Sequence, residues 1–519
     1  MIPNRFSDTL FQLIKSLEKG EKRHFKLFAK RSSSNEDLKI IELFDVLDKM
    51  PLYDEAILLK KLSSIKKPQL SNIKVHLYKQ LLASLRLLKS TDSIDLQLTE
   101  QLDYAHILYK KGLFAQSLKI LDKAKETANN NHKVNILIQL IALEKRIETL
   151  HITREMQSRA LQLSAEINTV NKKIDLHSKL SNLAMLLQSW FIQFGHTRNE
   201  IDEQNVKKYL QNHLPENALQ QNGFYERMYL YQSFSTYAYI RQDFVSYYKY
   251  AQKWVNVFEE EPVMVRVETS YYIKAMHSLL NAHFVLRNFQ QLDKVLAKFL
   301  IFSETDRVKL HDNFRTQAFV SIYSAKINQH NMLGTFKEGI KIVPYILEQI
   351  KANELFIDEY RVMIFNYKIA SLYFGNGNYS ICIDFLQKII QQTGDERNDL
   401  QGYARILHLI AHYELGNFEL MEYLTKSVYR FLAKKEYLTE IEKEMFKYLR
   451  NSFSITRKEL LVALNDLLGK IKNLEKNNFE TRVFAYLDIV SWIESKVNNK
   501  TLESILKEKN KLRKVRNYK

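Results

Sequence analysis

The sequence predicts an all-α protein in which helical hairpins repeat in tandem. Glycine and proline, which often interrupt helices, number only 12 and 6 in 519 residues. Apolar residues recur at helical spacing along most of the chain. A short turn that contains glycine also recurs between helical segments, at residues 377–379 and 416–418. Helix pairs repeated in this way stack on their neighbours, so the expected architecture is an α-solenoid with an N-terminal helical bundle.

Residues 1–90 are expected to form the N-terminal bundle. Two helices are expected within residues 5–30, with a break near Gly20. Asn35 is a suitable N-cap for the following helix. A short helix is expected near residues 53–63, then a break at residues 66–68, and then a long helix from Leu70 to Leu88 whose leucines recur at helical spacing.

Further along, the pattern predicts a hairpin over residues 95–128, two long helices over 132–171 and another helix over 176–194. Residues 213–223 contain Pro215 and Gly223 and are expected to be a linker. Tyrosines between residues 225 and 250 do not share one helical face, which predicts a helix contacted on more than one side. Pro262 is expected to start a helix, and Pro344 to kink or split one.

The chain therefore divides by pattern into four sections. These are a basic helical bundle (1–90), a first helical section (91–212), a repeat section (213–430), and C-terminal helices with a basic tail (431–519).

An aromatic residue follows each repeated turn, and its surroundings carry a family resemblance. These turn aromatics are Phe114, Phe244, Phe289, Phe336, Tyr379 and Phe418. Two residues earlier stands Gly112, Gly334, Gly377 or Gly416, replaced in two repeats by Gln242 and Arg287. Small residues follow three positions later at Ser117, Gly339 and Cys382. The pattern resembles divergent tetratricopeptide repeats of bacterial type. The last five aromatics are 45, 47, 43 and 39 residues apart, against about 34 in the family, which implies longer helices.

The resemblance implies a function in binding proteins or peptides along a concave surface. In such repeats the residues five, eight and twelve positions before the turn aromatic face that surface. Here they are Gln232, Thr236, Tyr239, His277, Asn281, Phe284, Ser324, Asn328, Asn331, Tyr367, Ser371 and Phe374. Amides can hydrogen-bond an extended peptide backbone, and aromatic rings can hold its apolar side chains. The plain alternative is an ordinary hydrated helix surface.

Positive charge is concentrated at the two ends of the chain. The net charge is +18, of which residues 1–90 carry +8 and residues 496–519 carry +7. Candidate anion-binding residues are Lys22, Arg23 and Lys26 at one end and Arg513, Lys514 and Arg516 at the other. Nucleic acid or another polyanion is one partner that this charge favours, and a merely well-solvated surface is the alternative. A further alternative is a peptide-responsive regulator whose N-terminal section is the effector, an arrangement that resembles bacterial peptide-sensing regulators.

The sequence contains no convincing catalytic constellation. Residues 334–339 have the glycine spacing of a phosphate loop, but Ile340 stands where that motif requires lysine. His408 and His412 are four residues apart without a third metal ligand, and Glu21 and His24 form a single Glu-x-x-His motif. We therefore expect no enzymatic activity, no cofactor and no metal.

Cysteine usage and hydropathy predict the compartment. The single cysteine, Cys382, cannot form a disulfide within the chain and is expected to be a small buried residue. No apolar run is long enough for a membrane span, and the N-terminus does not resemble a signal peptide. The expected location is cytoplasmic.

Overall fold

A computed structural model describes residues 8–30, 35–62, 64–90, 92–151, 156–220, 223–392, 398–434, 438–452, 457–474, 479–480 and 488–517. Of these residues 84% are helical and none is in a strand, so the predicted all-α class is confirmed. Contacts group the chain into two compact units, Met1–Lys172 and Lys173–Lys519. The division into four sections, which was made from the sequence pattern, stays a prediction.

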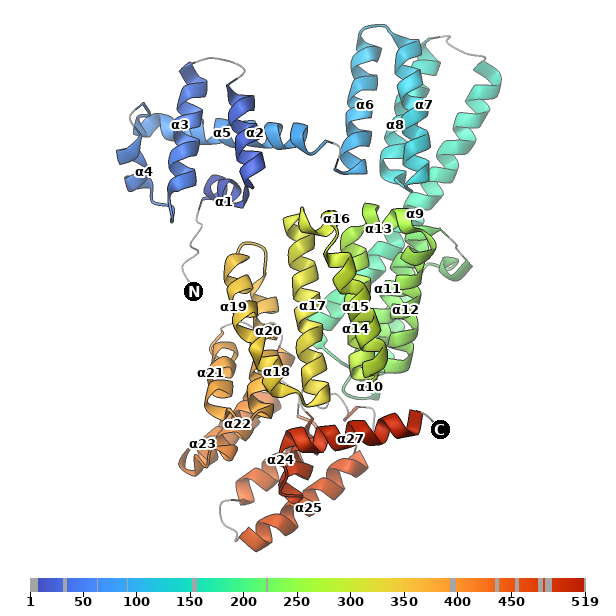
Figure 1. The fold of residues 1–519 in the computed structure, drawn as a ribbon. Helices are drawn as coiled ribbons and strands as arrows, with labels where there is room; N and C mark the ends of the chain where they lie inside the picture. Colours follow the sequence, from blue (N-terminus) through green and yellow to red (C-terminus); the bar gives the residue numbers. More distant parts are fainter. Residues whose placement is uncertain are drawn as a thin grey trace. The chain divides into compact units, whose positions relative to one another are not determined.

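The first unit begins with five helices around an apolar core. They are α1 (Thr9–Ser16), α2 (Lys19–Ala29), α3 (Asn35–Lys49), α4 (Glu55–Lys61) and α5 (Lys67–Leu88) (Figure 1). Phe11, Phe25 and Phe44 are almost completely buried between them. Two helices form here as predicted, although Gly20 itself lies in the first turn of α2. The break is at residues 17–18, where the backbone N–H of Glu18 donates to the Glu21 carboxylate at 2.9 Å and so caps α2. The predicted cap at Asn35 concerns a side chain outside the described ones.

The rest of this unit contains α6 (Ile94–Lys110), α7 (Phe114–Asn130), α8 (Val134–Leu150) and the start of α9 (Met156–Phe194). The sequence predicted separate helices for 132–171 and 176–194, and this division is wrong. Residues 156–194 form a single helix of 39 residues. No glycine or proline occurs in that segment, so nothing in it favours a turn.

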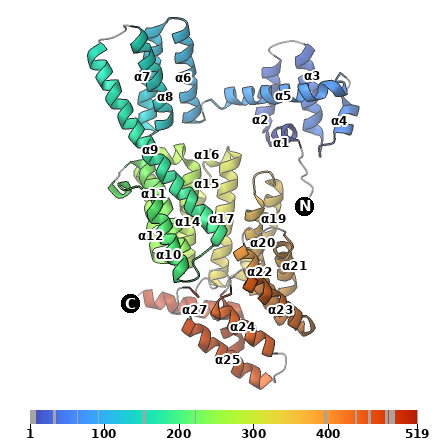
Figure 2. The same ribbon diagram turned by 180° about the vertical axis from the view of Figure 1, so that it is seen from behind.

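The second unit continues with helices that contact their successors along the chain. They are α10 (Glu200–His213), the short 3₁₀ helix η1 (Ala218–Gln220), α11 (Phe224–Ile240), α12 (Phe244–Glu260), α13 (Pro262–Val267), α14 (Thr269–Val285), α15 (Phe289–Ser303), α16 (Asp306–Lys309) and α17 (Asp312–Leu333). The helix start at Pro262 is confirmed, and α10 ends at His213, where the predicted linker begins. Helix α11 packs on α12 and, through Ile240, on α9 and α10 (Figure 2), so it is contacted on more than one side as predicted.

The following helices are α18 (Phe336–Lys341), α19 (Val343–Ala352), α20 (Glu359–Gly375), α21 (Tyr379–Ile390), α22 (Asn398–Glu414) and α23 (Phe418–Lys434). Pro344 lies in the first turn of α19 and separates it from α18, so the predicted split is confirmed. The chain then forms α24 (Glu440–Asn451), α25 (Arg457–Leu474), α26 (Ile489–Val497) and α27 (Leu502–Asn517). Helix α27 contacts α17, and the Asn510 side-chain amide donates to the carbonyl of Met332 at 3.0 Å.

Each predicted turn aromatic is the first residue of a helix, namely α7, α12, α15, α18, α21 or α23. The residue two positions before it has positive φ in every repeat, +71° to +82° at the four glycines. Gln242 and Arg287, which replace the glycine, adopt φ of 59° and 55°. The hairpin turn therefore keeps its left-handed residue even where the side chain disfavours it.

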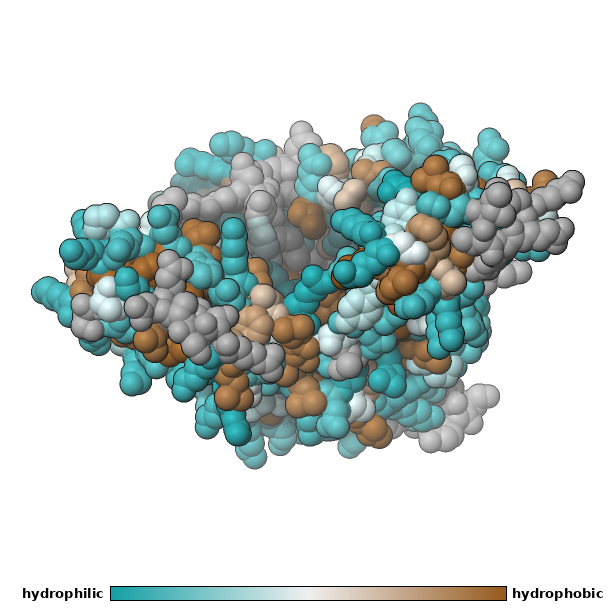
Figure 3. Space-filling view, turned by 90° about the horizontal axis from the view of Figure 1, so that it is seen from above, coloured by the Kyte–Doolittle hydropathy of each residue, from teal (hydrophilic) through white to brown (hydrophobic). Residues whose placement is uncertain are grey.

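Hydrophilic and apolar residues are both present on the surface. In the face shown in Figure 3, hydrophilic residues cover much of the area and apolar residues form smaller patches between them. In the part of the chain that the structure describes, no helix combines the length and apolar character needed to cross a bilayer.

Candidate ligand-binding cavity

A cavity of about 660 Å³ lies within the second unit. Its walls are formed mainly by α11, α14, α17 and α20, which are the helices that precede the turn aromatics 244, 289, 336 and 379. Eleven of the twelve predicted groove residues line it: Thr236, Tyr239, His277, Asn281, Phe284, Ser324, Asn328, Asn331, Tyr367, Ser371 and Phe374. Gln232 is not among the lining residues and is buried.

The convergence of these residues follows from helical geometry. Positions five, eight and twelve before the aromatic are three and four residues apart, so they lie on one face of the helix. The hairpin turn fixes which face that is, because the aromatic begins the second helix of the pair in every repeat. Successive helices therefore present the same face to a shared space.

The aromatic part of the wall is continuous from α11 to α14. The rings of Tyr239 and Tyr247 lie 4.9 Å apart between centroids. The Asn281 side-chain amide donates to the Tyr247 hydroxyl at 3.3 Å. Burial raises the pKa of Tyr247, so its hydroxyl stays neutral and can act as donor or acceptor. This wall can hold apolar groups and still offers polar atoms at its edge.

The amides supply hydrogen-bonding capacity on α17. Asn328 Oδ1 accepts a hydrogen bond from Lys368 Nζ at 2.8 Å, which leaves its NH₂ group directed to other partners. Asn331 Oδ1 is buried and has no hydrogen-bond partner among the described residues. Buried amide oxygens are usually paired, so an unpaired one at a cavity wall is a position where a ligand donor fits.

Three cationic side chains and a histidine line the middle of the cavity, and the groove prediction identified only the histidine. Lys274 and His277 lie on α14, while Arg361 and Lys368 lie on α20. By accessible surface, Lys274 and Arg361 are exposed, whereas Lys368 and His277 are half-buried. Burial lowers the pKa of Lys368 to about 7, and burial together with the field of Arg361 lowers that of Lys274. Burial and the charges of Lys368, Arg361 and Lys274 lower the pKa of His277 to about 4, so this imidazole is neutral.

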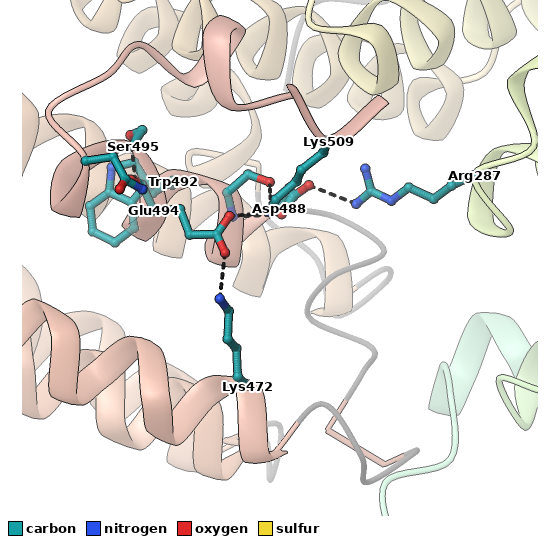
Figure 4. Close-up of polar contacts among 9 residues, drawn as sticks. Arg287, Lys472, Asp488, Trp492, Glu494, Ser495 and Lys509 are labelled. Carbon is teal, nitrogen blue, oxygen red and sulfur yellow. Dashed lines mark hydrogen bonds and ion pairs between the residues drawn. The ribbon is translucent and has the colours of Figure 1, made fainter. Parts of the chain in front are cut away.

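The C-terminal segment contributes Asp488, Leu502 and Leu506 to the lining of the cavity. Figure 4 shows the contacts that hold this segment: Asp488 pairs with Arg287 at 3.0 Å and accepts from the Ser491 backbone at 3.0 Å. Burial alone raises the pKa of Asp488, but Arg287 and Lys509 outweigh it, so the pKa is lowered and the carboxylate stays charged.

A second carboxylate fixes the same segment. Glu494 pairs with Lys472 at 2.8 Å and with Lys509 at 2.7 Å, which ties α26 to α25 and α27 (Figure 4). These contacts of the C-terminal segment were not predicted from the sequence. Residues 431–497 carry no repeat signature, and no short-range pattern shows that Asp488 meets Arg287, 201 residues away.

The anion-binding residues predicted at the N-terminal end include two lysines that have carboxylate neighbours. Lys22 pairs with Asp48 at 2.7 Å and Lys26 with Asp45 at 2.6 Å, so two of the three N-terminal cations are already neutralised by carboxylates on α3. Arg23 is exposed. The side chains of Arg513, Lys514 and Arg516 lie outside the described ones.

The histidines and the cysteine considered in the sequence analysis contact other side chains or are buried in the core. The His408 and His412 rings lie 4.6 Å apart, and burial, His412 and Arg405 lower the pKa of His408 to about 4. His24 Nδ1 is 2.8 Å from the Ser84 hydroxyl. Cys382 is fully buried, as predicted, and burial raises the pKa of its thiol. Among the described residues no cluster of three or more potential metal ligands occurs.

No protein-family model matches this chain, and no curated protein matches it. Its class is therefore defined by its fold and cavity. It is an all-α protein whose helical hairpins surround a cavity with aromatic, amide and cationic walls.

Proposed function

We propose that this protein is a non-catalytic, tetratricopeptide-like α-solenoid that binds an extended peptide or protein segment in the cavity. The observation that carries the proposal is the convergence of equivalent residues from four successive hairpins on one space of about 660 Å³. A volume of this size accommodates several side chains of a ligand. Regularly repeated helices offer their side chains at intervals along such a ligand.

The chemistry of the walls fits a peptide. Asn281 and Asn328 occupy equivalent positions, eight residues before Phe289 and Phe336, on neighbouring helices. Each amide can pair with a backbone N–H or C=O of an extended chain. Phe284 lies on the same walls, is half-buried and provides apolar contact area for a ligand.

The test measures peptide binding by the purified full-length chain. A peptide selected from a random library is titrated into the wild type and into the double variant Asn281→Ala/Asn328→Ala. We expect the double variant to bind at least tenfold more weakly, which corresponds to about 1.4 kcal/mol.

The matched control is Asn313→Ala, which removes the same amide from an exposed position of α17 that does not line the cavity. This variant is expected to bind as the wild type does. An affinity of the double variant within twofold of the wild type, or an equal loss in the control, contradicts the proposal.

A further inference from the structure

The described lining of the cavity contains more cationic than anionic side chains. Its described lining residues include Lys274, Arg287, Arg361 and Lys368 but only one carboxylate, that of Asp488. That carboxylate is already paired with Arg287 at 3.0 Å. Arg361 pairs with Asp358, which does not line the cavity. Among the described residues, Lys274 and Lys368 have no ion-pair partner.

These cations act on a common space. The charges of Lys368, Arg361 and Lys274 all reach His277, which lines the cavity between them. Helix α17 contacts both α14 and α20, so it brings Lys274 of the first and Lys368 of the second to the same cavity. Lys368 is half-buried, and cations withdrawn from water are normally paired, because removing an unpaired ion from water is costly. Since no described carboxylate pairs with Lys274 or Lys368, an anion from outside the chain can serve as their partner.

Two hydrogen bonds position the ammonium group of Lys368 in the cavity. Its ammonium donates to Asn328 Oδ1 at 2.8 Å and to the Ser324 carbonyl at 3.4 Å. An ammonium has three donors, so one donor remains for a ligand oxygen. His277 Nδ1 is buried and has no hydrogen-bond partner in the described part of the chain, which places a further polar atom at this point.

We propose that the cavity binds an acidic side chain of a peptide between Lys274 and Lys368, with the apolar neighbours of that side chain against the surrounding aromatic rings. The inference rests on the proposed function only in taking a peptide as the ligand. Phe284, Tyr367 and Phe374 line the same cavity. Aromatic rings contact apolar groups favourably, and a peptide has such groups whereas a small hydrated anion does not, so a peptide fits the walls better.

The experiment uses two pools of acetylated, amidated heptapeptides that are random except at the central residue, which is glutamate in one pool and glutamine in the other. Blocked ends ensure that the central side chain is the constant difference in charge between the pools. Each pool is passed over the immobilised full-length chain, and retained peptides are counted by mass spectrometry. A third arm repeats the glutamate pool in the presence of inorganic phosphate.

The variants are Lys274→Met/Lys368→Met and the matched control Lys294→Met/Lys341→Met. Lys294 and Lys341 are exposed, do not line the cavity, and have no ion-pair partner in the part of the chain that the structure describes. We expect at least tenfold more retention from the glutamate pool than from the glutamine pool. We expect the cavity variant to lose this preference, the control variant to keep it, and phosphate to reduce it.

Each other outcome has a distinct meaning. Equal retention of both pools, unchanged in the cavity variant, overturns the acidic-ligand inference and leaves peptide binding intact. Retention of neither pool, with phosphate stabilising the wild type but not the cavity variant against heat, overturns the peptide as ligand and assigns the site to a free anion. If the double variant does not fold, the test is phosphate competition with the wild-type chain. If phosphate leaves the retention of the glutamate pool unchanged, the acidic-ligand inference is overturned.

Discussion

Replacing Lys368 by methionine is expected to stabilise the protein below pH 7 and to lose this effect at high pH. The pKa of Lys368 falls from 10.5 to about 7 because the side chain is buried. Below pH 7 the lysine is charged in both the folded and unfolded states, so the folded state bears the full cost of the buried charge. Between pH 7 and 10.5 the folded lysine is neutral while the unfolded one is still protonated, so stability rises with pH.

The magnitude follows from the size of this shift. Each pKa unit corresponds to about 1.4 kcal/mol, so the shift of Lys368 sets an upper value of about 5 kcal/mol. Water in the cavity screens part of this cost, which gives about 2–5 kcal/mol for the stabilisation at pH 6. The second unit has about 350 residues, and unfolding entropy is about 2.1 cal/mol/K per residue. The expected rise in melting temperature is therefore about 3–7 °C.

At pH 10 the comparison changes sign. At this pH the folded lysine is neutral, so the free-energy cost of burying its charge has nearly disappeared. Methionine still lacks the hydrogen bond from Lys368 Nζ to Asn328 Oδ1. The variant is then expected to be less stable than the wild type by about 1 kcal/mol. The assay is thermal unfolding followed by circular dichroism between pH 6 and 10, with Lys294→Met as the control for removing an exposed lysine. A difference between Lys368→Met and the wild type that does not vary with pH refutes the reasoning.

Three further predictions concern the packing of each unit. Glu144→Gln, which weakens the pairing of two cations with a fully buried carboxylate, is expected to cost about 3 kcal/mol in denaturant unfolding. Gly339→Ala is expected to lower the melting temperature, because a Cβ there lies 2.7 Å from Leu372 Cδ2, whereas Gly469→Ala meets nothing within 4 Å and is expected to raise it slightly. Asp488→Asn weakens the ion pair with Arg287 and is expected to speed amide hydrogen exchange in α26 and α27. Unchanged exchange would show that this ion pair does not hold the two helices in place.

Local signals in the sequence were sufficient for the hairpins and for the inner face of the cavity. The turn aromatic marks the start of a second helix, and counting back from it identifies side chains such as Asn281 and Asn328 without any knowledge of the tertiary structure. This works because both the helical period and the hairpin turn are local properties of the backbone. The exact helix ends near Gly20 and in α9, which differ from the prediction, are also set locally. Glycine is tolerated in the first turn of α2, and α9 contains no residue that ends a helix at the expected place.

The charge of the cavity could not be predicted in the same way. Lys368 precedes Tyr379 by eleven residues and Lys274 precedes Phe289 by fifteen, so neither lies at a position that the repeat pattern marks. Each is an ordinary helix lysine in the sequence, and the pair is unusual only because no described carboxylate forms an ion pair with either lysine. The carboxylate that does line the cavity, Asp488, arrives from a segment 201 residues after Arg287. Because electrostatic surroundings depend on all elements that meet at a site, a regular repeat predicts where a cavity lies but not which charge it holds.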